Sequence, residues 1–286
     1  MNPRTPPLKP LLVVTNGLRG TIRPVMDVLL RMEEVTSEWC PLTDRRVLVW
    51  LARHAKVLAG ATTETPEWNH EALFYPPIEG ERTTRRIAGF PGPAEHVGCR
   101  HDGQLLWQRM LQANWGFYCD RVPRGPSTRF YAEPVPEWLP PVLAEAGIPH
   151  RVVVIARDPR GEIAELWHAG RRNGALPVAV NAVDTPMTLA ERQCSLETAA
   201  RIADLRRMKS TRETICVRYE DLIERTTAAW DRIRDWLGLP HRDAAPAPTT
   251  GDEWPESRWR PFVPDAAIDL YRIRMGEHLE GLGYAI

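Results

Sequence analysis

The sequence predicts an α/β fold, with a central parallel sheet and helices on both of its faces. The run from Val152 to Ile155 is apolar without interruption, which is typical of a strand buried on both sides in a parallel sheet. Such runs alternate along the chain with segments whose apolar residues recur at helical spacing. The 286 residues show no internal repeat and no dividing linker, so we expect a single domain over residues 1–286.

The N-terminal part of the chain predicts one strand and two helices. Residues 11–15 are an apolar run and are expected to form the first strand. After a glycine-containing loop, residues 22–34 carry apolar side chains at helical spacing. A second helix is expected over 44–58, with Thr43 or Asp44 as its N-cap.

The middle of the chain begins with a segment that predicts little regular structure. Residues 61–100 are rich in proline, glycine and charge, and irregular structure is expected there. Leucine and methionine at helical spacing then predict a helix over 103–113. A short strand over 130–132 and a helix over 137–146 follow.

The buried strand over 152–156 opens the second half, and a helix is expected over 160–172. A loop over 173–186 leads to a long helix over 188–209. A further buried strand is expected over 214–219.

Two helices complete the expected order. The first covers 226–237, and Gly238 with Pro240 beyond it is the signal that ends it. A Pro- and Gly-rich loop follows, and the last helix is expected over 264–282.

The composition indicates neither a nucleic acid nor a membrane as partner. The formal net charge is +0, so no overall field attracts a polyanion or an anionic surface. No apolar run approaches the ~20 residues that span a bilayer. The five cysteines are odd in number and lack C-x-x-C spacing, so we expect reduced, buried thiols, no metal site and a cytoplasmic location. Only three lysines occur: Lys9, Lys56 and Lys209.

Two segments carry groups suited to an anion. The loop Gly17-Leu-Arg-Gly-Thr21 lies between a strand and a helix, where backbone N–H groups and the helix dipole favour phosphate. It lacks the G-x-x-x-x-G-K-[ST] pattern of a nucleotide triphosphatase, and a packing turn is the alternative. Arg157 follows the strand over 152–156, at the sheet edge where ligands bind, and its guanidinium suits phosphate or sulfate. A structural ion pair is the alternative for Arg157.

These segments and a third one resemble the sulfotransferase family, whose members bind 3′-phosphoadenosine-5′-phosphosulfate (PAPS). The third segment is Val217-Arg-Tyr-Glu-Asp-Leu-Ile223, followed by a helix that ends in Leu237-Gly-Leu-Pro240. The tail, with Arg258-Trp-Arg260 and Leu282-Gly-Tyr284, also looks like bacterial members. The resemblance covers essentially the whole chain and implies a three-layer P-loop-like fold.

The resemblance also implies roles for single residues. The first loop, with Gly17, Gly20 and Thr21, would hold the 5′-phosphosulfate, and Arg157 would bind the 3′-phosphate. Tyr219 would lie near the adenine. Arg258 falls in the family's C-terminal cofactor loop.

Three positions depart from the family pattern. Leu18 stands where the family carries Lys or Arg, Glu165 replaces a serine, and Pro134 replaces a lysine. Two outcomes remain open. In one, arginines at positions 19, 157 and 160 supply the missing cations. In the other, Glu165 pairs with position 157 or 160 and keeps the phosphate out.

The candidate bases are Glu38 and His101, with His96 as an alternative to the histidine; the competing interpretation for each is an exposed surface residue. The leading functional hypothesis is a PAPS-dependent transfer of a sulfuryl group to a hydroxyl or amine of a small metabolite. A sulfotransferase-fold protein that has lost PAPS is the second hypothesis. A small-molecule kinase on a related P-loop fold is the third hypothesis. It ranks last because the loop lacks the lysine that such kinases carry. The oligomeric state is not indicated.

Overall fold

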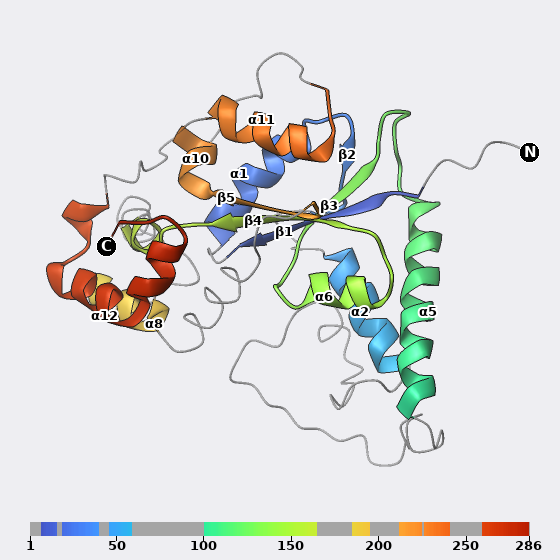
Figure 1. The fold of residues 1–286 in the computed structure, drawn as a ribbon, viewed down its shortest axis with the longest axis horizontal. Coiled ribbons are helices and arrows are strands. Elements are labelled where there is room, and N and C mark those ends of the chain that lie inside the picture. Colours follow the sequence, from blue (N-terminus) through green and yellow to red (C-terminus); the bar gives the residue numbers. More distant parts are fainter. Residues whose placement is uncertain are drawn as a thin grey trace, which may run out of the picture. The chain divides into compact units, whose positions relative to one another are not determined.

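The computed structural model contains a five-stranded sheet with helices around it (Figure 1). It describes residues 7–15, 19–39, 46–58, 100–164, 185–194, 212–224, 226–240 and 259–285. The strand order is β2-β3-β1-β4-β5, and the pairs β2–β3 and β4–β5 are parallel. The strands are β1 (Lys9–Thr15), β2 (Val35–Thr36), β3 (Phe130–Pro134), β4 (Arg151–Ala156) and β5 (Thr214–Arg218). The predicted parallel α/β sheet is confirmed.

The chain divides into two compact units. Unit 1 comprises residues 1–12 and 33–151, and unit 2 comprises residues 13–32 and 152–286. A single domain over the whole chain stays a prediction.

Unit 1 holds three described helices, which pack around α2. They are α2 (Val47–Leu58), α5 (Arg100–Cys119) and α6 (Leu139–Glu145). Helix α2 contacts both α5 and α6. The expected start at residue 44 is wrong, because Arg46 is not helical and α2 begins at Val47; the proposed caps Thr43 and Asp44 lie outside the described residues.

Unit 2 holds helices on either side of β4 and β5 in the sequence. They are α1 (Arg19–Leu29), α8 (Pro186–Gln193), α10 (Tyr219–Glu224), α11 (Thr226–Leu237) and α12 (Asp265–Gly281), with a 3₁₀ turn over Arg260–Phe262. Residues 159–164 are also helical, which confirms the start of the helix expected over 160–172; residues 165–184 and 195–211 lie outside the described residues.

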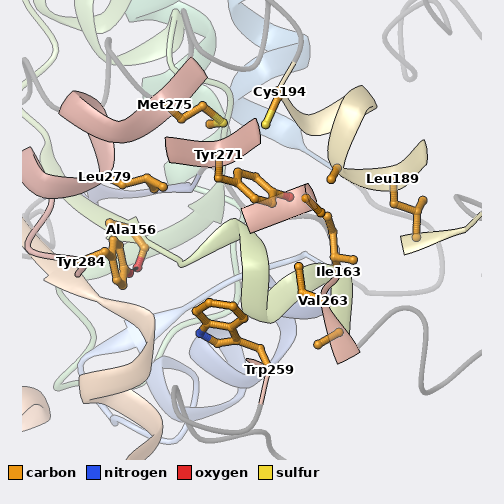
Figure 2. Packing of buried hydrophobic residues seen from close by; sticks show 13 residues of the cluster. Ala156, Ile163, Leu189, Cys194, Trp259, Val263, Tyr271, Met275, Leu279 and Tyr284 are labelled. Carbon is orange, nitrogen blue, oxygen red and sulfur yellow. Dashed lines mark hydrogen bonds between the residues drawn. The ribbon is translucent and has the colours of Figure 1, made fainter. Parts of the chain in front are cut away.

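The core of unit 2 brings its C-terminal helix onto the end of β4. Helices α8 and α12 pack together, and a buried cluster joins them to Ala156 and Ile163 (Figure 2). Tyr271 and Leu279 of α12 are fully buried in this cluster. Burying such side chains stabilises the unit by roughly 1.5–3 kcal/mol each.

The first helix begins and ends earlier than expected, and a short strand follows directly after its predicted range. Helix α1 ends at Leu29 rather than at residue 34, because the Glu34 carbonyl accepts hydrogen bonds from the N–H groups of Arg129 and Phe130, at 2.8 and 2.9 Å. Strand β2 then pairs in parallel with β3, which the sequence pattern did not predict because it has only two residues.

Tyr219 begins a helix instead of ending a strand. Strand β5 stops at Arg218, and α10 starts at Tyr219 with two acidic residues in its first turn. Carboxylates stabilise the N-terminal end of a helix dipole, so Glu220 and Asp221 favour a helix start here.

Three helices end on a glycine with a left-handed backbone, as the sequence predicted for one of them. Gly147, Gly238 and Gly283 have φ values of 66°, 70° and 86°. At Gly238 the N–H bonds the Asp235 carbonyl at 2.9 Å, and the next N–H bonds the Arg234 carbonyl at 3.0 Å. This is the Schellman pattern, and the expected stop of α11 is confirmed.

The described cysteines are reduced, and two of the three are buried. Cys119 and Cys194 are buried and free, whereas Cys216 is free but only half-buried, so the expectation of burial is wrong there. No group of three or more potential metal ligands occurs among the described residues. In the same part of the chain, no helix is both long enough and apolar enough to cross a bilayer.

Candidate functional site

Arg157 is the best-defined candidate side chain of unit 2. It follows β4 directly and is only 5% exposed. Its Nη1 donates a hydrogen bond to Thr21 Oγ1 at 3.1 Å. Its guanidinium carbon lies 4.6 Å from the centroid of the Tyr219 ring. The hydroxyl and the aromatic face therefore hold the guanidinium from two directions.

The three partners come from three distant segments of the sequence. Thr21 lies in the first turn of α1, Arg157 at the carboxyl end of β4, and Tyr219 at the start of α10. A helix N-terminus, a hydroxyl and a guanidinium are all donors suited to phosphate oxygens. Their chemistry fits the anionic end of a phosphonucleotide.

Arg160 is committed to a structural role. Its Nε and Nη2 bind both oxygens of Asp158, at 2.8 to 3.2 Å, and both side chains are buried. Nη2 also donates to the Ala285 carbonyl, and the guanidinium stacks over the Trp259 ring at 4.5 Å. The hypothesis that position 160 supplies a spare cation is therefore not favoured, since its donors already have carbonyl and carboxylate partners.

Glu220 connects this motif to the C-terminal tail. Its Oε1 accepts a hydrogen bond from the Asp158 N–H at 2.9 Å, and its Oε2 lies 2.7 Å from the Tyr284 hydroxyl. The same hydroxyl lies 2.9 Å from the Ala156 carbonyl. Burial raises the pKa of the Glu220 carboxyl, although the hydrogen bonds from the Asp158 N–H and the Tyr284 hydroxyl lower it in part.

Five of the nine site residues that the sequence proposed lie wholly or partly outside the described residues. Arg19 and Gly20 belong to the first turn of α1, and His101 to that of α5, but only their backbone is described. Gly17 and Arg258 lie outside the described residues altogether, as do the departures Leu18 and Glu165 and the alternative base His96.

Glu38 lies in unit 1 and contacts a pair of tyrosines. Its backbone N–H donates to the Tyr131 hydroxyl at 3.4 Å, and the Tyr118 and Tyr131 hydroxyls are 3.2 Å apart. Burial raises the pKa of Tyr118, and a hydrogen bond to the Glu38 side chain raises it further. Glu38 itself is exposed, so the expected surface position is confirmed while a role as base stays a prediction.

The tyrosine pair belongs to an aromatic cluster with Trp115. The Trp115 ring lies 5.8 Å from Tyr118 and 5.6 Å from Tyr131, measured between centroids. Trp115 and Trp107 are 5% and 2% exposed, which supports core packing as their role.

Glu133 is a fully buried carboxyl at the end of β3. It accepts hydrogen bonds from the backbone N–H groups of Leu48, at 2.9 and 3.0 Å, and Val49, at 3.3 Å, in the first turn of α2. Burial raises the pKa of Glu133 to about 8, although these N–H groups lower it in part. The neighbouring Pro134 is buried and supplies no charge where the family has a lysine.

Sequence patterns did not single out Asp158, Glu220, Tyr284 or Glu133 as site-forming residues. The sequence shows the acid directly after Tyr219 and the glycine directly before Tyr284. Their partners, however, lie 62 to 128 positions away, which no local pattern reveals.

The fold, rather than the sequence, relates this chain to known proteins. No protein-family model matches the sequence, and no curated protein matches it. Among solved structures, the sulfotransferase domain of the Synechococcus PCC 7002 olefin synthase matches with a TM-score of 0.50 and 15% identity, over 100% of this chain and 98% of its own. Mouse sulfotransferase SULT7A1, complexed with PAP, matches with a TM-score of 0.50 and 13% identity, over 97% of this chain and 89% of its own. The chain is therefore a divergent member of the sulfotransferase fold.

Proposed function

We propose that this protein is a PAPS-dependent sulfotransferase that acts on a hydroxyl or amine of a small metabolite. The observation that carries the proposal is the environment of Arg157, which is buried, hydrogen-bonded to Thr21 and stacked on Tyr219. These are three of the residues that the family resemblance assigns to the cofactor. A neighbour of the same fold was solved with PAP, which supports a 3′-phosphonucleotide as the ligand.

In the proposed site, each side chain acts on a different part of the nucleotide. Arg157 binds the 3′-phosphate, because a buried guanidinium is always charged and can donate two parallel hydrogen bonds. Tyr219 supports the guanidinium and lies near the adenine. Thr21 and the first turn of α1 bind the 5′ end, where N–H groups and the helix dipole favour an anion. Gly17, Arg19, Gly20 and Arg258 complete this proposed site.

PAPS, when bound, supplies the sulfuryl group. In the transfer, the bond between sulfur and the phosphate oxygen breaks, and a bond from sulfur to the acceptor oxygen or nitrogen forms. The transition state is loose by analogy with phosphoryl transfer, so positioning and cationic stabilisation of the leaving phosphate supply most of the rate. The acceptor proton passes to a base, for which Glu38 and His101 are the proposed residues.

Calorimetric titration of the purified protein with 3′,5′-ADP tests the cofactor site, with 5′-AMP as the comparison nucleotide. We expect micromolar binding that needs the 3′-phosphate. Arg157→Ala should weaken 3′,5′-ADP at least about 100-fold and leave 5′-AMP nearly unchanged, because a buried charge-assisted contact is lost. Equal binding by the variant and the parent would refute the assignment of Arg157.

Arg272→Ala is the matched control. Arg272 is an exposed arginine of α12 that pairs with Asp269 at 2.8 Å. Exposed pairs contribute about 0–1 kcal/mol, so nucleotide binding should not change. Turnover is then followed as 3′,5′-ADP release from PAPS with a panel of hydroxyl and amine acceptors. Glu38→Gln should lower turnover without changing 3′,5′-ADP affinity.

The second candidate is a protein of this fold that no longer uses PAPS. It is favoured by Pro134, which is buried at the end of β3 where the resembling family has a lysine. Absence of 3′,5′-ADP binding at millimolar concentration by the parent would support this candidate and refute the first.

A further inference from the structure

The backbone on both sides of Arg157 is fixed by hydrogen bonds to side chains. On one side, the Ala156 carbonyl lies 2.9 Å from the Tyr284 hydroxyl, which can donate to it. On the other side, the Asp158 N–H donates to Glu220 Oε1 at 2.9 Å. Tyr284 and Glu220 also contact each other, at 2.7 Å. Tyr284 and Glu220 therefore link the backbone before Arg157 to the backbone after it, and Arg157 is the residue that we assign to the 3′-phosphate.

The end of α12 aims Tyr284 at this point. Gly283 has a φ of 86°, and its N–H bonds the Glu280 carbonyl at 2.9 Å, while the Tyr284 N–H bonds the Leu279 carbonyl at 3.0 Å. This is a Schellman turn, which reverses the direction of the chain after α12 and directs Tyr284 back toward the core. Figure 2 shows Tyr284 beside Ala156, and the residue is 2% exposed.

The tail is held in place by further contacts. The guanidinium of Arg218 lies 4.5 Å from the centroid of the Tyr284 ring, and its Nη1 donates to the Gly283 carbonyl at 3.3 Å. Arg160 donates to the Ala285 carbonyl and binds Asp158. Because these three contacts already fix the tail, Tyr284 can hold the end of β4 with little further loss of chain entropy.

The Tyr284 hydroxyl serves two acceptors. It has one hydrogen, and it lies within hydrogen-bond distance of both the Ala156 carbonyl and the Glu220 carboxyl, toward which it can donate. Burial raises the pKa of this carboxyl, while the hydrogen bonds from the Asp158 N–H and the Tyr284 hydroxyl lower it in part. An amide at position 220 would keep both contacts, because its oxygen can accept from Asp158 and its NH₂ group can donate to the Tyr284 oxygen.

We propose that Glu220 and Tyr284 are positioning residues that fix the backbone on both sides of Arg157 and so hold its guanidinium for the 3′-phosphate. The inference rests on the proposed function. It adds two residues that act through Arg157 and do not contact the nucleotide. Tyr219 strengthens the link, because it precedes Glu220 on α10 and stacks on the guanidinium. A displaced α10 would therefore move both the stacking face and the backbone support.

The test is the preference for the 3′-phosphate, measured as the ratio of the dissociation constants for 5′-AMP and 3′,5′-ADP. Tyr284→Phe keeps the ring and removes the hydroxyl, and it should lower this ratio about tenfold, the factor expected for one buried hydrogen bond. Glu220→Ala should lower it at least as much. Glu220→Gln should keep it within about twofold of the parent, because the amide accepts from Asp158 and donates to Tyr284.

Tyr131→Phe is the matched control, since it removes an equally buried hydroxyl from unit 1. It should keep the parent's ratio. All titrations are made well below each variant's unfolding midpoint, and if Tyr284→Phe does not fold, Glu220→Ala and Glu220→Gln form the decisive pair.

The outcomes separate this inference from the proposed function. Unchanged ratios in Tyr284→Phe and Glu220→Ala would overturn the inference and leave the function standing. Equal weakening of both nucleotides would also overturn it, because that result indicates general destabilisation. A parent that does not distinguish 3′,5′-ADP from 5′-AMP would refute the proposed function and this inference with it.

Discussion

Two buried glutamates, one in each unit, face backbone N–H groups but serve different purposes. Glu133 in unit 1 accepts from Leu48 and Val49, at the start of α2. Glu220 in unit 2 accepts from Asp158 and contacts Tyr284. Burial raises the pKa of both carboxyls. The two carboxyl groups have the same chemistry. Their roles differ because the backbone N–H groups that they accept from lie in different parts of the fold.

For Glu133, the donors are the free N–H groups of a helix's first turn. A helix leaves such donors without intrahelical partners, and a carboxyl that accepts from them stabilises the helix start. For Glu220, the donor belongs to the loop that follows β4 and lies next to Arg157. We infer that removing Glu133 affects mainly stability, whereas removing Glu220 affects mainly the preference for a 3′-phosphate.

The largest expected effect is a pH dependence of stability caused by Glu133. Its pKa is about 8 in the folded protein and about 4.5 in a solvated chain. Between these values the folded state retains a proton that the unfolded state loses, so stability is full below the lower value and falls as pH rises toward the upper one. The free energy of unfolding should fall by up to about 1.4 kcal/mol per pH unit over this window.

Urea titrations at several pH values, on the parent and on Glu133→Gln, measure this slope. The neutral amide should remove it. Glu280→Gln, an exposed carboxyl of α12, controls for the change in net charge and should keep the parent's slope. The same slope in Glu133→Gln and in the parent would show that Glu133 is not its source.

The next effect is the loss of the cap itself. Glu133→Ala leaves the N–H groups of Leu48 and Val49 without their carboxyl acceptor and removes a fully buried side chain. We expect a loss of about 2–3 kcal/mol in the free energy of unfolding at pH 6, combined with faster hydrogen exchange in the first turn of α2. The preference for 3′,5′-ADP over 5′-AMP should stay at the parent value. A changed preference would contradict the inference that Glu133 affects mainly stability.

A smaller effect separates two glycines that end helices in the same way. Gly283→Ala and Gly238→Ala each place a side chain on a left-handed backbone, at φ values of 86° and 70°, with no neighbouring atom within 4 Å of the added Cβ. Each should cost about 1–2 kcal/mol of stability. Only Gly283→Ala should also lower the preference for the 3′-phosphate, because only that turn aims Tyr284. Equal preferences in the two variants would argue against a role for the tail.

The smallest expected effect concerns the tyrosine pair of unit 1. Tyr131→Phe removes a buried hydroxyl that lies 3.2 Å from Tyr118 and 3.4 Å from the Glu38 nitrogen. Thermal unfolding should show a loss of about 1 kcal/mol. If Glu38 is the base, the variant should also shift the pH profile of turnover, because Tyr118 and Tyr131 support the Glu38 segment; an unchanged profile would leave this pair a purely structural role.

Local signals predicted the elements that depend on local physics. The apolar run at 152–156 matches β4, and the stop of α11 at Gly238 matches the observed Schellman turn. Burial of consecutive apolar side chains and the left-handed freedom of glycine are both readable in a few neighbouring residues. Strand β2 escaped prediction, since two residues carry no periodicity and their pairing with β3 depends on residues 130–131.

The candidate site divides in the same way. Arg157 and Tyr219 were predicted from their segments, and the structure places them 4.6 Å apart, guanidinium to ring, with Thr21 beside them. The role of Arg160 was not predictable, because its choice of Asp158, Ala285 and Trp259 as partners depends on where the tail returns. Side chains that bind charge look alike in a sequence whether they hold a ligand or the fold.

The sequence alone determined most of the β-α order, the stop of α11 at Gly238 and the segments that bear the cationic and aromatic groups, because each depends on residues within one or two turns of chain. The tertiary structure alone decided that the Tyr284 hydroxyl reaches Ala156 and Glu220, across 128 and 64 positions, and that Glu133 caps a helix 85 positions away. A buried polar group must find its partner wherever the fold brings one within about 3 Å, and that distance is set by packing rather than by separation along the chain.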